Sequence, residues 1–489
     1  MRSQSWVGSS ERSRAETIPG QGSVLQVHPR AFRDELVSAA HWVAEYLERL
    51  PQGPVTRPLP PSLRHRLSSG GLSERGGDLF GVLDFAEDSL APYPTGNGHP
   101  AFFAWINSPP SPAGVIAELL ATAINATCGM GEHALMDLER GVIADLAGLA
   151  GMAESTGGVL TSGGSMANLL CLAAARHWYL TEHHAADGPE YDAAHARLVA
   201  YCGEQAHMSV AKAAAVIGIP RSRVRVIPTT PDRCMDVTAL ADAVRADRAA
   251  GLLPFCVVSN LGSTPTGAVD TPAAINAVCR AHGMWHHADG AWGGLGARVP
   301  RWADAYRGMT EIDSLTVDPH KTLSVPVGCG AALVTDPDRL RAAFGFRASY
   351  LDSDEHLPWM SEYTFELTRP GTRALALWAT LHQLGRAGVT ALLEHYDRMA
   401  DYLRERIETH PRLELLACGP LPVVCFRVTG VASHTALATA VQARGRAYLA
   451  TVDHDGETVL RACICNHRTE TAHIDTLIDE ILTAAAQLD

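Results

Sequence analysis

The sequence predicts an α/β protein built on a mostly parallel β-sheet, because short apolar segments alternate with helical segments through the middle of the chain. Each apolar segment is compact and bounded by turn residues, which is typical of a buried strand. Helical spacing of apolar residues marks several of the connections, so we expect helices on both faces of the sheet. The predicted strands are GGVLT, RLVAYCG, RVRVIP, PFCVVSN, GMWHHADG, DSLTVDPH and GCGAALVTD.

The segments before and after this region divide the chain into four predicted parts. A polar leader (1–30) precedes an N-terminal segment (31–110), in which an amphipathic helix is followed by a Pro-rich stretch predicted to run extended (51–67). The large domain (111–367) begins with an α-rich stretch and contains the predicted sheet. A smaller α+β domain (368–489) has a long helix, the strand-like runs LPVVCFRV and TVLRACIC, and a terminal helix from about Thr471.

Composition narrows the function classes. The chain has 489 residues, 46% of them apolar, and a formal net charge of −13, which argues against nucleic acid or an anionic membrane as the main partner. No apolar stretch is long enough to span a bilayer, and the leader lacks the apolar core of a signal peptide. Eleven cysteines are scattered, and the pair Cys463 and Cys465 has no second pair nearby. We therefore expect a cytoplasmic protein with free thiols and no metal site.

Side chains capable of chemistry follow the ends of the predicted strands. Ligands of parallel α/β sheets bind at this carboxyl edge, so these residues are expected to converge. The chain has few lysines, yet one of them stands where a predicted strand gives way to a loop of small residues. The residues at the strand ends are Ser165, His207, Thr264, Asp289, Ala291, His320 and Lys321.

This set suits pyridoxal 5′-phosphate (PLP). The aldehyde of PLP needs a lysine amine, and its phosphate suits a Gly/Ser turn that opens a helix. An ionised carboxylate keeps the pyridine nitrogen protonated, and an imidazole can cover the flat ring. Taken singly, each residue has an ordinary alternative: Lys321 on the surface, Asp289 as a helix cap, His207 as a buried histidine, and TSGGS as a common turn before a helix. The order and joint placement of the residues favour PLP.

Seven blocks in a fixed order resemble the group II PLP-dependent amino-acid decarboxylases, which include aromatic-L-amino-acid, glutamate and histidine decarboxylases. The resemblance runs from about Phe32 to the last helix. The blocks are HPAFFAWINSPP (99–110), TSGGSMANLLCLAAAR (161–176), AHMSVAKAA (206–214), NLGSTPTGAVD (260–270), WHHADGAWGG (285–294), DSLTVDPHKTL (313–323) and VVCFRV (423–428).

The resemblance implies the aspartate-aminotransferase-like fold (fold type I), with a mostly parallel seven-stranded sheet, helices on both faces and a smaller C-terminal α+β domain. It also implies a homodimer, with the N-terminal segment wrapping the partner and the active site at the interface. The implied roles are as follows: Lys321 forms the Schiff base, Asp289 pairs with the ring nitrogen, His207 stacks on the ring, Thr264 supports Asp289, Gly164, Ser165 and His320 hold the phosphate, and Ala291 packs under the ring.

The resemblance also implies which residues line the substrate pocket and where a catalytic tyrosine lies. In the family, the stretch after HPAFFA lines the substrate pocket, which here is Trp105, Ile106, Asn107 and Ser108. This stretch is apolar and aromatic and has no Arg or Lys to pair with a side-chain carboxylate, so an aromatic or large apolar L-amino acid is favoured as the substrate.

The family also has a mobile loop that presents a catalytic tyrosine. Tyr350 stands where that tyrosine is expected, and an ordinary surface tyrosine is the alternative.

The expected reaction is decarboxylation of the amino acid to an amine and carbon dioxide, through a Schiff base with Lys321. Three other readings stay open from the sequence: oxidative conversion to an aldehyde on the same scaffold, decarboxylation of an acidic amino acid, and a non-catalytic protein that keeps the fold. Asp318 departs from the family pattern, which often has Asn at this position, and it adds a carboxylate close to the expected phosphate site.

Overall fold

The structure is a computed structural model that describes residues 25, 27–74, 79–129, 131–184, 186–345 and 358–488. The chain forms two compact units, Met1–Thr95 and Gly96–Asp489. Most of the predicted leader (1–30) lies outside the described residues. The predicted boundaries at 110/111 and 367/368 stay predictions.

In its described residues, the first unit contains three α-helices, α1 (Pro29–Arg49), α2 (Pro61–Ser68) and α3 (Phe80–Phe85). Helix α1 agrees with the predicted amphipathic helix; Pro29 is in its first turn and the His28 side chain accepts a hydrogen bond from the N–H of Arg30. The prediction that residues 51–67 run extended is wrong for their second half, because α2 forms there. Helix α2 starts at Pro61, and a proline is well tolerated at the first helical position, where its missing N–H would have no helical partner.

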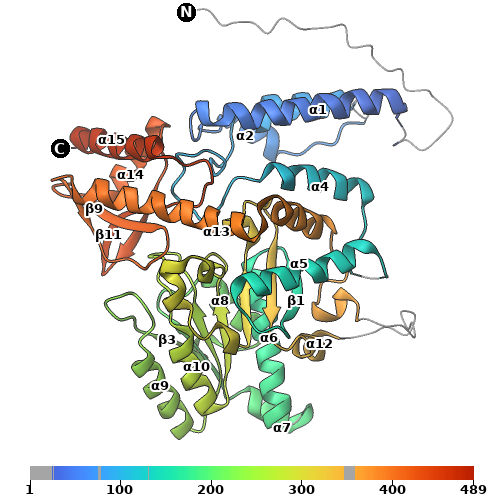
Figure 1. Cartoon of the computed structure of the whole chain (residues 1–489), viewed down its shortest axis with the longest axis vertical. Helices are drawn as coiled ribbons and strands as arrows, with labels where there is room; N and C mark the ends of the chain where they lie inside the picture. Colours follow the sequence, from blue (N-terminus) through green and yellow to red (C-terminus); the bar gives the residue numbers. More distant parts are fainter. Residues whose placement is uncertain are drawn as a thin grey trace, which may run out of the picture. The chain divides into compact units, whose positions relative to one another are not determined.

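The second unit is organised by a seven-stranded sheet whose strands are the seven predicted apolar segments (Figure 1). The spatial order is β1-β7-β6-β5-β4-β2-β3. Neighbours from β6 through β5, β4 and β2 to β3 pair in parallel, and β7 runs antiparallel to both β6 and β1. The mostly parallel sheet is thus confirmed. The strands are β1 (Gly157–Thr161), β2 (Leu198–Gly203), β3 (Val224–Ile227), β4 (Leu253–Asn260), β5 (Trp285–Asp289), β6 (Ser314–Val317) and β7 (Gly330–Val334).

Helices cover both faces of this sheet, as predicted, and the alternation along β2 shows how. Leu198, Ala200 and Cys202 pack in the same core as apolar residues of α6 (Gly164–His183). Val199 and Tyr201 point to the opposite face, against residues of α9 (Val237–Ala249) and α10 (Pro272–His282). Because successive strand residues face opposite sides, a strand buried on both faces reads as a continuous apolar run.

The C-terminal part contains a second, antiparallel sheet in the order β10-β11-β9-β8, drawn in orange to red in Figure 1. The strands β9 (Val423–Val428) and β11 (Glu457–Cys463) correspond to the two predicted runs. Two strands were not predicted, β8 (Leu413–Leu415) and β10 (Ala450–His454), because they are only partly buried and lack an apolar run. The last helix, α15 (Thr471–Leu488), begins at the predicted residue.

The remaining helices of the second unit surround these sheets. Helix α13 breaks at Gly385, which has φ 61° and ψ 176°. The helices are α4 (Pro112–Ile124), α5 (Ala134–Ala150), α7 (Gly188–His195), α8 (Met208–Val216), α11 (Pro319–Thr322), α12 (Asp338–Phe344), α13 (Thr372–Glu408) and α14 (His434–Arg444).

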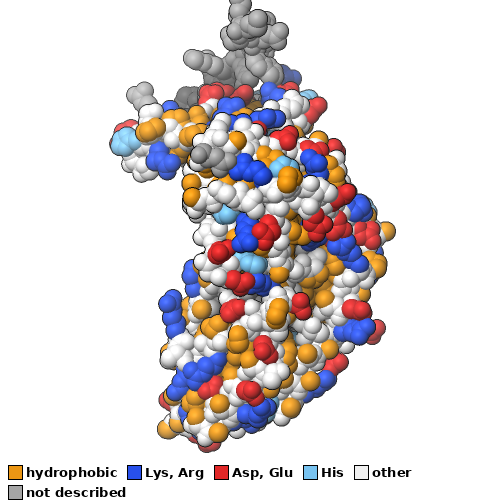
Figure 2. All heavy atoms as spheres, turned by 90° about the vertical axis from the view of Figure 1, so that its left-hand side faces the viewer, with side chains coloured by type: hydrophobic (Ala, Val, Ile, Leu, Met, Phe, Trp, Pro, Cys, Tyr) orange, Lys and Arg blue, Asp and Glu red, His pale blue; other side chains and the backbone are white. Residues whose placement is uncertain are grey.

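The surface carries charges of both signs. On the face drawn in Figure 2, Lys and Arg side chains are interspersed with Asp and Glu side chains. Within the described ranges, none of the helices has the combination of length and apolar character that crossing a bilayer requires.

A buried ion pair connects three segments that are distant in sequence. The Arg369 guanidinium donates from Nη1 to Glu139 Oε1 and to the Leu160 carbonyl, both at 2.9 Å, and from Nη2 to the Cys128 carbonyl at 2.8 Å. Glu139 also accepts from the N–H of Leu160. Both charged side chains are buried, at 1% and 2% exposure. The pair therefore fixes α5, β1 and the segment before α13 to one another.

We predict that Arg369→Leu lowers the free energy of unfolding by about 3–5 kcal/mol, because Glu139 would be left as a buried charge without its partner. Denaturant unfolding measures this loss. Arg307→Leu is the matched control, since Arg307 pairs with Asp304 where both side chains are more than 70% exposed, and it should change stability by at most about 1 kcal/mol. Equal effects of the two substitutions would contradict the structural role of Arg369.

Candidate active site

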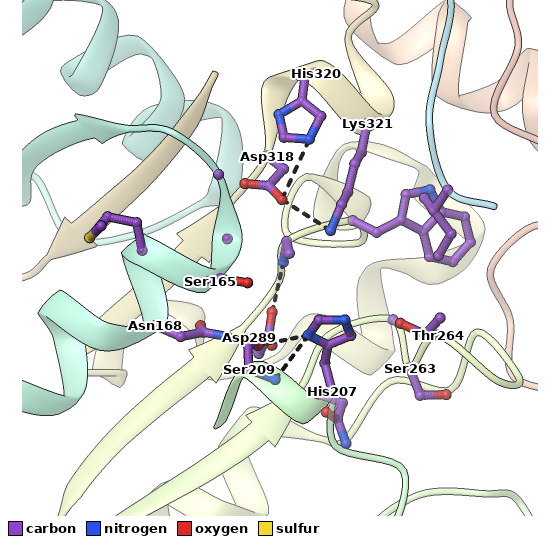
Figure 3. A pocket seen from close by; sticks show the side chains of 18 of the residues that line it. Ser165, Asn168, His207, Ser209, Ser263, Thr264, Asp289, Asp318, His320 and Lys321 are labelled. Atoms are coloured by element: carbon purple, nitrogen blue, oxygen red, sulfur yellow. Dashed lines mark hydrogen bonds and ion pairs between the residues drawn. The ribbon is translucent and has the colours of Figure 1, made fainter. Parts of the chain in front are cut away.

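A cavity of about 280 Å³ opens at the carboxyl ends of β1, β4, β5 and β6 (Figure 3). This is where the sequence placed the site, since each of these strands is followed directly by residues that line the cavity. The cavity brings together nine of the predicted site residues: Lys321, Asp289, His207, Thr264, Gly164, Ser165, His320, Ala291 and Ile106.

Lys321 reaches the cavity from α11, the single helical turn that follows β6. Its Nζ lies 3.0 Å from Asp318 Oδ2. Burial opposes the charged form of Lys321, but the carboxylates of Asp318 and Asp289 outweigh it and raise the pKa of the amine above its ordinary value. Asp318 Oδ1 is buried and has no hydrogen-bond partner among the described residues. Asp318 is therefore the immediate counter-ion of the lysine.

Asp289 ends β5 and lies at the cavity wall across from Lys321 in Figure 3. Its Oδ2 accepts a hydrogen bond from Asn168 Nδ2 at 2.9 Å, and its Oδ1 accepts from the N–H of Ala291 at 3.1 Å. The family resemblance implied that Thr264 supports this carboxylate. The structure corrects that assignment, because Thr264 lies on the wall beyond His207 and Asn168 makes the contact (Figure 3).

Asn168 was missed from the sequence, although it connects four side chains. Its Nδ2 also donates to Ser209 Oγ at 2.9 Å, and its Oδ1 accepts from Thr316 Oγ1 at 2.7 Å. His287 Nε2 lies 2.9 Å from the same Oδ1. One signal could have found it: Asn168 stands one helical turn after Gly164, so the two share the helix face that meets the cavity.

His207 caps the start of α8 and is held in one orientation by Ser209. The His207 Nδ1 accepts from the N–H of Ser209 at 3.2 Å and lies 2.7 Å from Ser209 Oγ. Burial lowers the pKa of the imidazole; Asp289 opposes this shift and Lys321 adds to it. A neutral imidazole with Nδ1 as acceptor carries its proton on Nε2. The ring is thus a planar, uncharged wall of the cavity.

The start of α6 forms a cradle of backbone groups. The first N–H groups of a helix have no partner within it, and here they belong to Gly164 and Ser165, which line the cavity. A Cβ at Gly164 would lie 2.9 Å from Asp318 Oδ2 and 3.1 Å from the Ala291 Cβ, so only glycine fits. His320 stands beside this turn, and its Nδ1 donates to the Cys329 carbonyl at 2.6 Å. Helix N–H groups and the helix dipole favour an anion at this position.

The predicted substrate-pocket residues are divided by the structure. Ile106 lines the cavity. Trp105 does not, since it is 48% exposed and its ring packs against those of Phe102 and Tyr448. Ser108 is buried behind the site and donates to the His320 carbonyl at 2.9 Å, and Asn107 is half-buried outside the cavity lining. Tyr350 lies outside the described residues.

These groups fit PLP by their chemistry. An amine, a buried carboxylate held by two donors, a flat neutral ring and a helix N-terminus line one cavity. Glycine at position 164 lets the start of α6 approach Asp318 and Ala291 closely, because a Cβ there would be too tight against both. Each part of the cofactor, aldehyde, ring nitrogen, ring face and phosphate, has a complementary group here.

We predict that Asp318→Asn lowers the pKa of Lys321 in the cofactor-free protein, because the nearest negative charge is removed while the burial that favours the neutral amine remains. The amine then loses its proton at lower pH than in the wild type. Reductive ¹³C-methylation followed by NMR titration measures this directly, since Lys212 is the only other lysine of the chain and serves as internal reference. An unchanged Lys321 titration would contradict the role given to Asp318.

Comparison with known proteins agrees with this site. Residues 64–429 match the model of the pyridoxal-dependent decarboxylase conserved domain. An aromatic-L-amino-acid decarboxylase of Bacillus atrophaeus is 28% identical over 479 residues, covering 95% of this chain and 97% of the relative. A 4-hydroxyphenylacetaldehyde synthase of Rhodiola rosea is 27% identical over 468 residues, covering 91% and 93%.

Among solved structures, the tryptophan decarboxylase of Catharanthus roseus in complex with L-tryptophan superimposes with a TM-score of 0.86 at 24% identity, over 95% of this chain and 99% of the other. This likeness confirms the predicted fold type. The family match covers most of the chain, including every residue that lines the cavity. The chain therefore belongs to the family of pyridoxal-dependent decarboxylases, enzymes whose cofactor is pyridoxal 5′-phosphate.

Proposed function

We propose that this decarboxylase acts on an aromatic L-amino acid and releases the corresponding amine and carbon dioxide. The observation that carries the proposal is the joint placement of Lys321 and Asp289 in one cavity at the carboxyl edge of the sheet. Bound PLP supplies an electron sink for the carbanion that forms when the carboxylate leaves.

The residues of the chain have distinct roles in this proposal. Lys321 supplies the amine that binds the aldehyde. Asp289 holds the positive charge at the ring nitrogen, and Asn168 keeps its carboxylate in place through the bond to Oδ2. His207 covers the ring with its neutral face. The start of α6, with Ser165 and His320, holds the phosphate.

The lining of the cavity favours a substrate without a side-chain charge. Among the described residues that line it, Lys321 is the sole Lys or Arg, and in the proposal its amine is engaged by the cofactor. A glutamate-type side chain would thus be buried without a partner, which is costly. Ile106, Met166 and Trp292 offer apolar contacts instead. The aromatic substrates named for the relatives agree with this choice.

A second candidate reaction on the same fold is oxidation of the amino acid to an aldehyde. The similarity to the Rhodiola rosea synthase favours testing it. In the decarboxylase proposal Tyr350 delivers a proton to the carbon that loses the carboxylate. Products separate the two outcomes: the proposal expects amine and carbon dioxide in equal amounts, whereas the oxidative reaction consumes oxygen and forms hydrogen peroxide with aldehyde.

We predict that the wild-type protein takes up PLP with a visible absorbance band and releases carbon dioxide from aromatic amino acids but not from glutamate. Lys321→Ala should lose the band and reduce turnover by a factor on the order of 10³ or more, because no other residue supplies the amine. Lys212→Ala is the matched control, since it removes the only other lysine, which is exposed on α8. If the band is lost in the Lys212 variant and not in the Lys321 variant, Lys321 is not the residue that binds the PLP aldehyde.

We further propose that two copies of the chain associate through α4. This helix exposes four large apolar side chains, Ile116, Leu119, Leu120 and Ile124, each between 50% and 61% exposed. Their spacing places them on one face of the helix. A contiguous apolar stripe of this kind marks an interaction surface, and a second copy of the chain matches the homodimer expected from the resemblance.

We predict that Leu120→Asp shifts the protein from dimer to monomer at micromolar concentration in sedimentation velocity, because a charge would enter the apolar contact. Val216→Asp is the control, since Val216 is 72% exposed on α8, outside this stripe. If the Leu120 variant remains dimeric, α4 is not the interface.

We also propose that the enzyme works in the cytoplasm. All eleven cysteines lie in the described ranges and all are free thiols. Free thiols in this number are typical of a reducing compartment.

A further inference from the structure

Cys418 and Cys425 form a thiol pair outside the active-site cavity. Cys418 lies in the turn between β8 and β9 and is half-buried, whereas Cys425 is buried within β9. The N–H of Cys425 donates to Cys418 Sγ at 3.5 Å. This contact places the sulfur of Cys418 within about 5 Å of the Cys425 Cα, since N–Cα is about 1.5 Å, and the two thiol side chains are in contact.

Arg404 and His454 flank this turn. Arg404 donates from Nη2 to the Leu421 carbonyl at 3.2 Å, and His454 Nε2 lies 2.9 Å from the Ala417 carbonyl. The contact with the Cys425 thiol, the Cys425 N–H and the nearby Arg404 and His454 together lower the pKa of Cys418 to about 6, against the opposing effect of burial. Contact with Cys418 and burial raise the pKa of Cys425, so Cys418 is the more acidic thiol of the pair.

We propose that Cys418 and Cys425 are a peroxide-reactive pair, in which Cys418 attacks and Cys425 resolves. The Cys418 thiolate attacks one oxygen of a hydroperoxide, the O–O bond breaks, and Cys418 becomes a sulfenic acid while the peroxide leaves as water or alcohol. The Cys425 sulfur then attacks Cys418 Sγ, forming the disulfide and releasing the sulfenic oxygen as water. Two thiols are oxidised by two electrons and one peroxide is reduced.

The pair is connected to the active site by one loop. Gly262, Ser263 and Thr264 line the cavity, and the loop that bears them continues through residues 265–268. Cys425 Sγ donates to the Pro265 carbonyl at 3.4 Å, and the N–H of Gly419 donates to the Thr266 carbonyl at 2.8 Å. A disulfide removes the thiol donor from Pro265 and fixes the turn to β9. Oxidation would thus loosen the support of the wall that carries Thr264.

No other pair offers the same combination. Cys463 and Cys465 are both buried, so a reagent has no access to them. Cys234 is the only other cysteine that is not buried, but burial and the carboxylates of Asp270 and Asp232 raise its pKa to about 11. Cys234 is therefore a suitable comparison for Cys418, because both side chains are half-buried but their pKa values are shifted in opposite directions.

The first test is alkylation kinetics with iodoacetamide on the intact protein. At pH 7 the difference in thiolate fraction, partly offset by the lower nucleophilicity of the more acidic thiol, predicts that Cys418 reacts roughly thirtyfold faster than Cys234. The fast phase should disappear in Cys418→Ser, persist in Cys234→Ser, and reach half its maximal rate near the pKa of about 6. Equal rates at the two cysteines would overturn the proposal.

The second test is treatment with hydrogen peroxide, followed by peptide mass spectrometry and a PLP titration. The wild type should yield a peptide linking Cys418 and Cys425 and should then bind PLP about fivefold more weakly, the effect of one lost hydrogen bond. Cys425→Ser keeps a donor for Pro265 and should stop at the sulfenic acid with unchanged PLP affinity. Absence of the linked peptide, or unchanged affinity of the oxidised wild type, would overturn the proposal.

Discussion

The site depends on a buried carboxylate, Asp289, held at the end of a central strand. A carboxylate at 7% exposure is costly unless donors satisfy it, and Asn168 and the N–H of Ala291 do so. Asn168 comes from α6, the same helix whose first turn forms the anion cradle. One helix thus positions both the amide that holds Asp289 and the free N–H groups of its first turn, at a spacing set by its own periodicity.

Charge balance in the cavity follows from the same burial. Two carboxylates, Asp289 and Asp318, face one ammonium, Lys321, so the lysine stays protonated although burial alone would favour the neutral amine. The histidine beside them responds in the opposite way, since its pKa is lowered and it remains neutral. Asp318 is the direct counter-ion in this balance, because its carboxylate lies 3.0 Å from the lysine amine.

Much of this arrangement was predictable. The seven strands of the large sheet were all recognisable, because strands buried on both faces must be apolar throughout and turn residues bound them. The cavity residues Lys321, Asp289, His207 and Ser165 were found because strand ends in a parallel sheet meet at one edge. The strands β8 and β10 were missed because half-exposed edge strands carry no such pattern.

The sequence by itself determined the fold class, the edge of the sheet that holds the cavity and most of the residue types that line it, since these follow from local patterns of burial and from strand order. Only the tertiary structure decided which donor reaches which acceptor. Asn168 rather than Thr264 holds Asp289, Trp105 turns away from the cavity, and Cys418 meets Cys425 beside the loop of Thr264. These contacts join separate elements, and their distances depend on how helices and loops pack, which no local pattern encodes.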